Sequence, residues 1–458
     1  MMKKIHLSTQ TFDILSNTVK IGIPVAIQSA LVAILSLADV LMVSNFGKEA
    51  TAAVGLASKW HFIAIMIMAG LSTASGILVA QFWGKNDQSA ARKITLLAAK
   101  AGVWILLPIS LIFVFFSENI LGIQTTDTNV IKLGSDYLLY ASPVLILTHL
   151  VIVTESTMRS SGDSLTPLFI AAITIIINIS LNYCLISGQF GLNPMGVAGA
   201  ALATTLARLL QIFAFYVYFQ CKNHWLTTTV TDPNVDISSL KKTYKKLAIP
   251  AVASALLWAS GTMLYQIIFG HIGTLELAVY STLGPFESLC YALFFGLSVA
   301  CSVIIGQNLG RQRFDTAMET SKLFTKLFAL LGISTTLLLL VFQPWLLSAL
   351  EMNSEQYLPL SKPAMTILSI AISLKMLNMV IINGVLRAGG ENAFCLRMDF
   401  IAMWLFGLPI TALAAFVMEY NFQQVYAMML VEEVIKLGLC WQRYRKNKWL
   451  RDLTTAET

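Results

Sequence analysis

The sequence predicts an all-α integral membrane protein with twelve transmembrane helices in two pseudo-symmetric six-helix lobes. Composition is the first reason: 56% of the 458 residues are hydrophobic and 12% are charged, whereas soluble domains carry about 25% charged residues. The second reason is a series of long apolar stretches, and the third is an internal repeat. Lipid must therefore be the solvent for most of this chain.

The apolar stretches each reach the roughly 20 residues that a helix needs to cross the hydrocarbon core. They lie near 15–43, 54–82, 94–117, 135–158, 165–187, 196–220, 243–270, 284–306, 323–348, 363–386, 397–418 and 422–441. The longest polar connection separates the first six from the last six. We therefore expect an N-lobe at 1–221, a cytoplasmic linker at 222–242, a C-lobe at 243–442 and a cytoplasmic tail at 443–458.

The two halves of the chain repeat one another. Gly70-Leu71-Ser72 recurs as Gly296-Leu297-Ser298, 226 positions later. Met158-Arg159-Ser160-Ser161-Gly162-Asp163 recurs as Leu386-Arg387-Ala388-Gly389-Gly390-Glu391, 228 positions later. Tandem membrane repeats related by an axis along the membrane normal are typical of transporters, which handle substrate between the repeats.

Basic residues indicate how the chain is oriented. They concentrate at both ends and in one alternate set of loops, including the linker and the tail. The opposite loops and their flanks hold little beyond Lys48, Lys59, Lys132 and Lys362. The positive-inside rule then predicts a multi-pass protein of the cell inner (plasma) membrane with both termini in the cytoplasm. This orientation explains the net charge of +7 better than a nucleic-acid partner does.

The sequence lacks the Gly-rich phosphate loop of nucleotide hydrolases. We therefore expect no cofactor, and energy from an ion gradient or from a partner subunit.

Asp39 is the sharpest candidate for a functional residue, because it lies well inside the first apolar stretch with no other charge within a helical turn. Ionisable groups in lipid are costly and usually functional. Asn178 and Asn182, in the fifth stretch, share one helix face. Their counterparts in the second half are apolar, and the repeat partner of Asp39 is Tyr265. A carboxylate with two amide carbonyls is suited to a proton or to Na⁺; the alternative is interhelical hydrogen bonding alone.

The second half carries its own charged cluster: Glu287, Lys375 and Asp399. Mutual neutralisation, with Glu287 or Asp399 as the counter-ion of Lys375, is as well supported as a direct role in binding substrate or ion. A structural role is the favoured interpretation of four further charges: Arg208, Glu432, Glu433 and Lys436.

The two copies of the hexapeptide resemble the repeated "LRGxGD" signature of bacterial multidrug and toxic compound extrusion (MATE) transporters. The first copy opens with Met158 instead of leucine, and the second closes with Glu391 instead of aspartate. Other segments resemble that family too, and together they cover essentially the whole chain: Pro24 to Gly47, Gly70-Leu71-Ser72 with Gln81 and Gly84, Tyr137-Leu138 before Pro143, and 404–409.

The resemblance implies a V-shaped pair of lobes that alternates between outward- and inward-facing states. It also implies a transporter, not an enzyme: an antiporter that exports amphiphilic, often cationic drugs against H⁺ or Na⁺. Its partners would be small-molecule drugs or organic cations and membrane lipid, and it would act as a monomer.

The resemblance further implies where the coupling ion binds. The positions that match the N-lobe site of the family are Asp39, Tyr137, Asn178, Asn182 and Thr204. Some relatives have an aspartate where this chain has Asn182, so the site carries one negative charge fewer. Another branch binds a cation in the C-lobe with a glutamate in span seven and an aspartate in span ten. Here those positions are Trp258 and Lys375 or Met376, so we expect that C-lobe site to be absent.

Three alternatives belong to other functional classes. A flippase for a lipid-linked oligosaccharide or other lipid-like substrate would need several cationic residues in its cavity, and intramembrane Lys and Arg are few here. A membrane-embedded enzyme is disfavoured because His61, His149 and His271 are too scattered for a metal site. A receptor or scaffold would need a larger domain outside the membrane.

Overall fold

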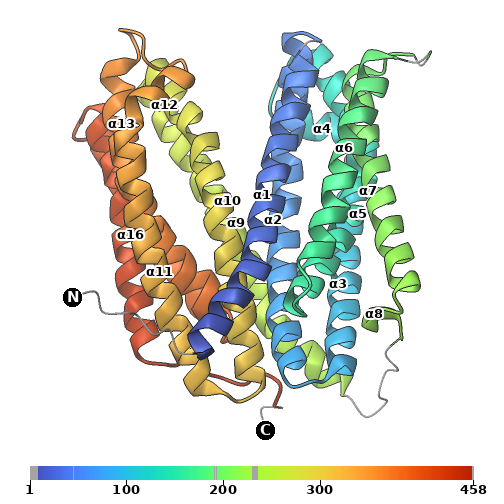
Figure 1. The fold of residues 1–458 in the computed structure, drawn as a ribbon. Helices are drawn as coiled ribbons and strands as arrows, with labels where there is room; N and C mark the ends of the chain where they lie inside the picture. The colour runs from blue at the N-terminus through green and yellow to red at the C-terminus, as the bar shows by residue number, and fades with distance from the viewer. Residues whose placement is uncertain (1–8, 45, 190, 192, 229–235, 456–458) are drawn as a thin grey trace. The chain divides into compact units, whose positions relative to one another are not determined.

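The computed structural model describes residues 9–44, 46–189, 191, 193–228 and 236–455, and its regular elements are all helices (Figure 1). In chain order they are α1 (Thr9–Ser44), α2 (Lys48–Gly84), α3 (Gln88–Phe115), α4 (Ser117–Gly122), α5 (Thr128–Ser160), α6 (Leu165–Ser187), α7 (Gly196–Cys221), α8 (Trp225–Thr228), α9 (Ile237–Ile272), α10 (Thr274–Gly310), α11 (Phe314–Val341), α12 (Gln343–Ala349), α13 (Leu358–Met379), the π-helix η1 (Val380–Leu386), α14 (Asn392–Asp399), the π-helix η2 (Phe400–Gly407), α15 (Leu408–Phe416) and α16 (Phe422–Arg445).

The predicted all-α membrane fold is confirmed, with one difference in the spans. Within the described residues, eleven helical segments are long and apolar enough to cross a membrane. The tenth joins α13 to η1 and the eleventh joins α14, η2 and α15. The predicted twelfth span is the helix α16, which is long enough but carries Glu432, Glu433 and Lys436 in its middle. Because of these three charges, α16 is not among the eleven segments that are apolar enough to cross a membrane. It packs against α13, α15 and η2.

The chain divides into two compact units, which differ from the predicted lobes at their edges. The N-terminal unit comprises residues 27–248, and the C-terminal unit comprises residues 1–26 and 249–458. Thus α1 and α9 each contribute residues to both units. Tyr244 near the start of α9 donates a hydrogen bond to the carbonyl oxygen of Leu71 over 3.2 Å, which places it in the N-terminal unit. The lobes as functional units remain a prediction.

The helix α9 begins at Ile237, within the predicted linker 222–242. Residues 229–235 of the predicted linker lie outside the described residues, as do 456–458 of the tail and the basic residues Lys3 and Lys4.

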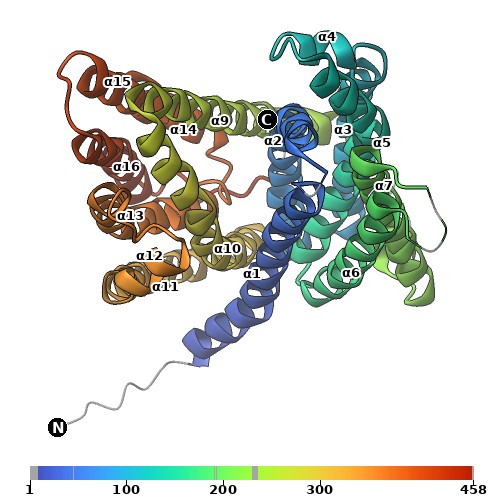
Figure 2. The same cartoon turned by 90° about the horizontal axis from the view of Figure 1, so that it is seen from above.

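In the N-terminal unit, α5 packs against α2, α3 and α7 (Figures 1 and 2). His149 of α5 is completely buried, and its Nε2 lies 3.1 Å from the carbonyl oxygen of Ala98 on α3. Its ring occupies the space that a side chain at Gly102 would fill. His149 is therefore a packed core residue that fixes the α3–α5 contact.

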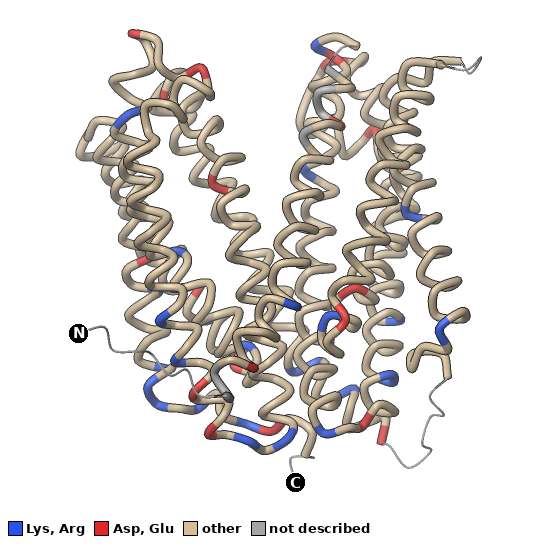
Figure 3. Tube along the Cα trace, in the orientation of Figure 1, with Lys and Arg blue, Asp and Glu red and all other residues tan. Residues whose placement is uncertain are grey.

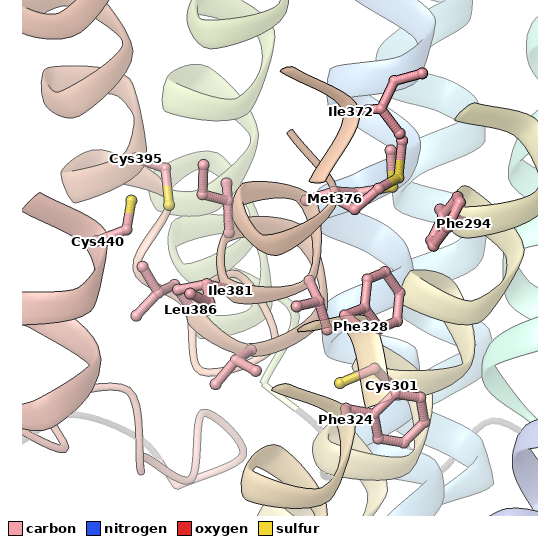
Figure 4. Close-up of a cluster of buried hydrophobic side chains, with 14 of the residues drawn as sticks. Phe294, Cys301, Phe324, Phe328, Ile372, Met376, Ile381, Leu386, Cys395 and Cys440 are labelled. Atoms are coloured by element: carbon pink, nitrogen blue, oxygen red, sulfur yellow. The ribbon is translucent and has the colours of Figure 1, made fainter. Parts of the chain in front are cut away.

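In the C-terminal unit, α13 and η1 pack against α10 and α11. Figure 4 shows the apolar side chains that fill this contact. Phe324 and Phe328 of α11 lie in one buried cluster with Met376 of α13 and with Ile381 and Leu386 of η1.

The repeated hexapeptide builds the same turn in both units. Gly162 and Gly390 adopt φ angles of 100° and 81°, in the left-handed region that glycine enters without a steric penalty. In each copy the N–H of the residue after this glycine donates to the carbonyl oxygen of the first residue of the motif. Asp163 donates to Met158 over 2.9 Å, and Glu391 donates to Leu386 over 3.1 Å. The motif therefore ends a transmembrane helix.

The closing residues of the two copies have different partners. Asp163 accepts a hydrogen bond from the N–H of Thr166 at 3.1 Å and so caps α6. Glu391 instead pairs with two arginines, Arg443 at 2.6 Å and Arg451. Glu391 thus joins the turn of the second copy to the C-terminal segment.

Charge is distributed unevenly along the helices. Figure 3 shows that, within each unit, Lys and Arg gather toward one end of the helices. This distribution agrees with the loop pattern read from the sequence.

A helix crossing in the C-terminal unit gives a stability prediction. A methyl group on Gly296 would overlap backbone atoms of Gly22 and Ala26, whereas Gly284 of the same helix has nothing within 4 Å of that position. We expect Gly296→Ala to lower the free energy of unfolding by about 1–3 kcal/mol, because backbone atoms cannot repack as side chains do. Gly284→Ala removes a helix-interior glycine and should raise it by up to ~1 kcal/mol. Thermal unfolding of the purified variants in detergent tests this, and equal midpoints would contradict the close crossing.

Candidate functional site

Asp39 heads a chain of polar side chains that runs from α1 across α6 to α7. Its half-buried carboxylate accepts a hydrogen bond from Nδ2 of Asn182 at 2.6 Å. The same Nδ2 donates to Oδ1 of Asn178 at 3.2 Å, and Nδ2 of Asn178 donates to the hydroxyl of Thr204 at 3.5 Å. The structure thus brings together four of the five residues that the resemblance implies, although each lies far from Asp39 in sequence.

Helix periodicity places the two amides. Asn178 and Asn182 lie four residues apart on α6 and are 2% and 0% exposed. They lie on the side of α6 that packs against α7. Thr204 is held by its own helix, since its hydroxyl donates to the carbonyl oxygen of Ala200 over 3.0 Å. The amides therefore sit at fixed positions beside the carboxylate of Asp39.

Tyr137 is the fifth residue of the predicted set. It lies on α5 and packs against an apolar cluster that includes Val43 of α1, Val54 of α2 and Ile186 of α6. The charge of Asp39 acts on its hydroxyl. Tyr137 thus lies among α1, α2 and α6, within electrostatic reach of Asp39.

One atom of the site lacks a partner. Oδ1 of Asn182 is buried and, within the described residues, receives no hydrogen bond. Buried polar atoms are normally satisfied, so an orphaned acceptor beside a carboxylate calls for an explanation. A protonated Asp39 would supply an O–H donor, and a cation would be bound by both oxygens.

The described residues contain no group of three or more His, Cys, Asp or Glu side chains that would hold a metal ion. At Asp39 the oxygens that could meet a cation are those of the carboxylate, one of which already accepts a hydrogen bond from Asn182, and the carbonyl oxygen of Asn182. This sparse donor set fits a proton, or a weakly bound Na⁺ completed by water.

A second buried network in the same unit was recognised from the sequence only at Arg208. Glu155 of α5 accepts a hydrogen bond from Nε2 of Gln211 at 3.1 Å and lies 3.5 Å from Arg159. Arg208 donates to Gln211 over 2.7 Å, and its charge acts on both Glu155 and Asp39. The sequence signal that could have revealed this network is the spacing of Glu155 and Arg159. An acid and a base four residues apart near the end of an apolar stretch indicate an ion pair on one helix face.

The arginines of the two hexapeptides make matching contacts. Arg159 donates to Oε1 of Gln28 over 3.4 Å, and Arg387 donates to the hydroxyl of Ser254 over 3.0 Å. Gln28 and Ser254 are 226 positions apart, so they are repeat partners. Each motif therefore ties its helix to the first helix of its own repeat.

The charged cluster predicted in the second half separates into two groups. Lys375 pairs with Glu287, so Glu287 is its counter-ion. Asp399 accepts a hydrogen bond from Ser254 and lies 3.9 Å from Lys436. The structure does not bring Asp399 to Lys375.

The second of these groups contains the repeat partner of Asp39. Tyr265 donates its hydroxyl to Oε2 of Glu432 over 2.8 Å, and Nζ of Lys436 donates to Oε1 of Glu432 over 2.9 Å. Glu432 and Lys436 are 5% and 7% exposed. The two units thus differ: the first has its acid on α1, whereas the second has a phenol at the equivalent position of α9 and its acid on α16.

Comparison with known proteins identifies the family. The family model MatE matches residues 24–184 and 250–413, which is more than half of the chain and covers both repeats.

The chain belongs to the MATE family of membrane transporters.

Relatives match this MATE transporter over most of their length. The uncharacterized transporter YisQ of Bacillus subtilis is 24% identical over 437 residues, 93% of each chain. The probable multidrug resistance protein NorM of Thermotoga maritima is 23% identical, over 90% of this chain and 87% of its own.

The fold is shared with solved structures of the family. The Vibrio cholerae MATE transporter VcmN in its bent form matches with a TM-score of 0.87 at 19% identity, covering 96% of this chain and 98% of that one. The eukaryotic MATE transporter AtDTX14 matches with a TM-score of 0.83 at 17% identity, covering 98% and 99%.

Proposed function

We propose that this MATE transporter is a secondary active multidrug exporter that expels amphiphilic, cationic compounds against an inward flow of H⁺ or Na⁺. The observation that carries the proposal is the buried carboxylate of Asp39 beside the orphaned carbonyl oxygen of Asn182. A proton or a cation bound between the two groups would neutralise the carboxylate and give the carbonyl oxygen a partner. A relative named as a probable multidrug resistance protein supports the substrate class.

The coupling follows from the change in hydrogen bonding when Asp39 is neutralised. The ionised carboxylate only accepts hydrogen bonds, and it accepts a charge-assisted one from Asn182. A bound proton would turn one oxygen into a donor to Oδ1 of Asn182, and the charge of Arg208 would lose one of its two counter-charges. Neutralisation thus acts on α1, α6 and α7 together.

This change is large enough to drive a conformational step. Loss of one intramembrane charge is worth roughly a few kcal/mol, which inverts the populations of two states separated by a similar gap. In the proposed cycle, the ion enters from outside, neutralises Asp39 and favours the state that releases the drug outward.

We further propose the cell inner membrane as the location, with both termini in the cytoplasm and a monomer as the working unit. The gathering of basic residues at one end of the helices supports this orientation (Figure 3).

Efflux of a fluorescent cationic dye from energised cells tests this function. Cells that express the protein should retain less dye than cells that do not. The proton gradient and the Na⁺ gradient are then removed separately. Loss of efflux with a protonophore alone assigns H⁺, and loss on withdrawal of Na⁺ alone assigns Na⁺. Dye retention equal to that of non-expressing cells under both gradients would contradict drug export.

A further inference from the structure

We propose that Glu433 of α16 and Asn378 of α13 form a second proton-binding site, in the C-terminal unit. This site uses none of the residues of the Asp39 site and does not depend on the exported substrate. It also differs from the C-lobe site of other MATE proteins, whose acidic positions are Trp258 and Lys375 or Met376 here.

The two side chains are joined by well-formed hydrogen bonds. Nδ2 of Asn378 donates to Oε2 of Glu433 over 2.7 Å and to the main-chain oxygen of Glu433 over 2.9 Å. A primary amide has two N–H donors, so both are used. Asn378 is 3% exposed and Glu433 is half-buried, so the amide side of the pair lies away from solvent.

The acceptor of the same amide is left without a donor. Within the described residues, no group donates to the buried Oδ1 of Asn378. An ionised Glu433 carries no hydrogen and cannot satisfy this atom. A protonated Glu433 has one O–H, and the cyclic pairing of a carboxylic acid with an amide would send that O–H to Oδ1 while Nδ2 keeps its bond to Oε2. The pair is therefore complete only when it holds a proton.

The charges around the pair leave room for one positive charge. Within the described residues, every other acid of the cluster takes part in an ion pair: Glu287 with Lys375, and Glu432 and Asp399 with Lys436. Glu433 is bonded to an amide instead. Four carboxylates thus face two lysines, with Arg387 reaching Asp399 only through Ser254.

The other titratable groups near Glu433 are two phenols and two ammonium groups. The phenols of Tyr265 and Tyr291 lie within its electrostatic reach, as do the ammonium groups of Lys375 and Lys436. Of the other elements packed on α16, η1, η2 and α15 contain no ionisable residue, and α14 contributes Arg397 and Asp399. A proton on Glu433 would thus reduce the excess of the four carboxylates over the two lysines of this cluster.

The N-terminal unit contains the same arrangement. There, Nδ2 of Asn182 donates to Asp39 and Oδ1 of Asn182 is likewise buried and without a donor. Both units thus contain a carboxylate that accepts a hydrogen bond from a buried asparagine. In both, the carbonyl oxygen of that asparagine receives no hydrogen bond from the described residues. This recurrence, at positions that the repeat does not align, supports a common chemistry.

Infrared difference spectroscopy tests the site without any transport. The purified protein in liposomes is compared at high and low pH, and the carbonyl band of a protonated carboxylic acid is recorded. We expect Glu433→Gln to remove one such band that Glu319→Gln retains, since Glu319 is an exposed acid of α11. The band should persist in Asp39→Asn, which separates this site from the one proposed for export.

A second variant keeps the proposal testable if Glu433→Gln does not fold. Asn378→Leu keeps the acid but removes its partner, so the Glu433 band should shift to the frequency of a less strongly hydrogen-bonded acid. Identical spectra for the wild type and both variants would overturn the proposal. A band that disappears on adding Na⁺ at constant pH would also overturn it, in favour of a Na⁺ site.

Discussion

Replacing Asp39 with asparagine is expected to abolish gradient-driven export while leaving the protein folded in the membrane. Asparagine has nearly the same shape, and its side-chain oxygen can still accept the hydrogen bond from Asn182. It cannot gain or lose a proton and carries no charge to attract Na⁺. The bias of a few kcal/mol that couples the ion to the conformational step is then lost, and a ~3 kcal/mol bias corresponds to roughly a hundred-fold change in rate or population.

The measurement is dye uptake into inverted vesicles, normalised to the amount of transporter in the membrane. Asp136→Asn is the matched control, because Asp136 lies next to Tyr137 on α5 but is exposed. It removes the same charge outside the polar chain and should export at the wild-type rate. Undiminished export by Asp39→Asn would rule out Asp39 as the coupling residue.

Much of the N-terminal site was predictable from the sequence. Asp39 stands out because it is a lone charge in an apolar stretch, and a spacing of four residues places Asn178 and Asn182 on one helix face. The structure adds that this face meets Asp39 itself, with 2.6 Å between Nδ2 and Oδ1. Thr204 entered only through the resemblance, since a single threonine in a membrane helix carries no signal.

The C-terminal unit was less predictable, because its contacts join distant helices. Lys375 had two candidate counter-ions in the sequence, and only the packing of α10 against α13 selects Glu287. Asn378 was missed entirely: a lone amide is common between membrane helices, and its partner Glu433 is on α16.

The π-helices limit what helix periodicity can assign in this unit. Asn378 lies just before η1, and Asp399 immediately precedes η2. A π-helix changes the hydrogen-bond step from i→i+4 to i→i+5. The residues beyond it are rotated relative to an α-helical pattern, so a face assigned with a period of 3.6 residues fails across such a segment.

The charge cluster on α16 gives the other large prediction. Glu432→Leu should lower the free energy of unfolding by about 3–5 kcal/mol, because it leaves the buried ammonium of Lys436 without its close partner. Of its ion-pair partners within the described residues, Lys436 would keep Asp399, at 3.9 Å, and the hydroxyl of Tyr265 would lose its acceptor. Thermal or denaturant unfolding of the purified protein in detergent measures the effect.

A double-mutant cycle decides whether the loss comes from the unpaired charge or from packing. Lys436→Met in the Glu432→Leu background removes the stranded charge, so the double variant should recover much of the lost stability. Additive losses would mean that Glu432 and Lys436 act independently, in contradiction to the 2.9 Å contact between them. Recovery would instead show that the charges of the last helix are mutually dependent. That helix falls short of an apolar span because of these charges, so pairing them is what lets it pack beside α13.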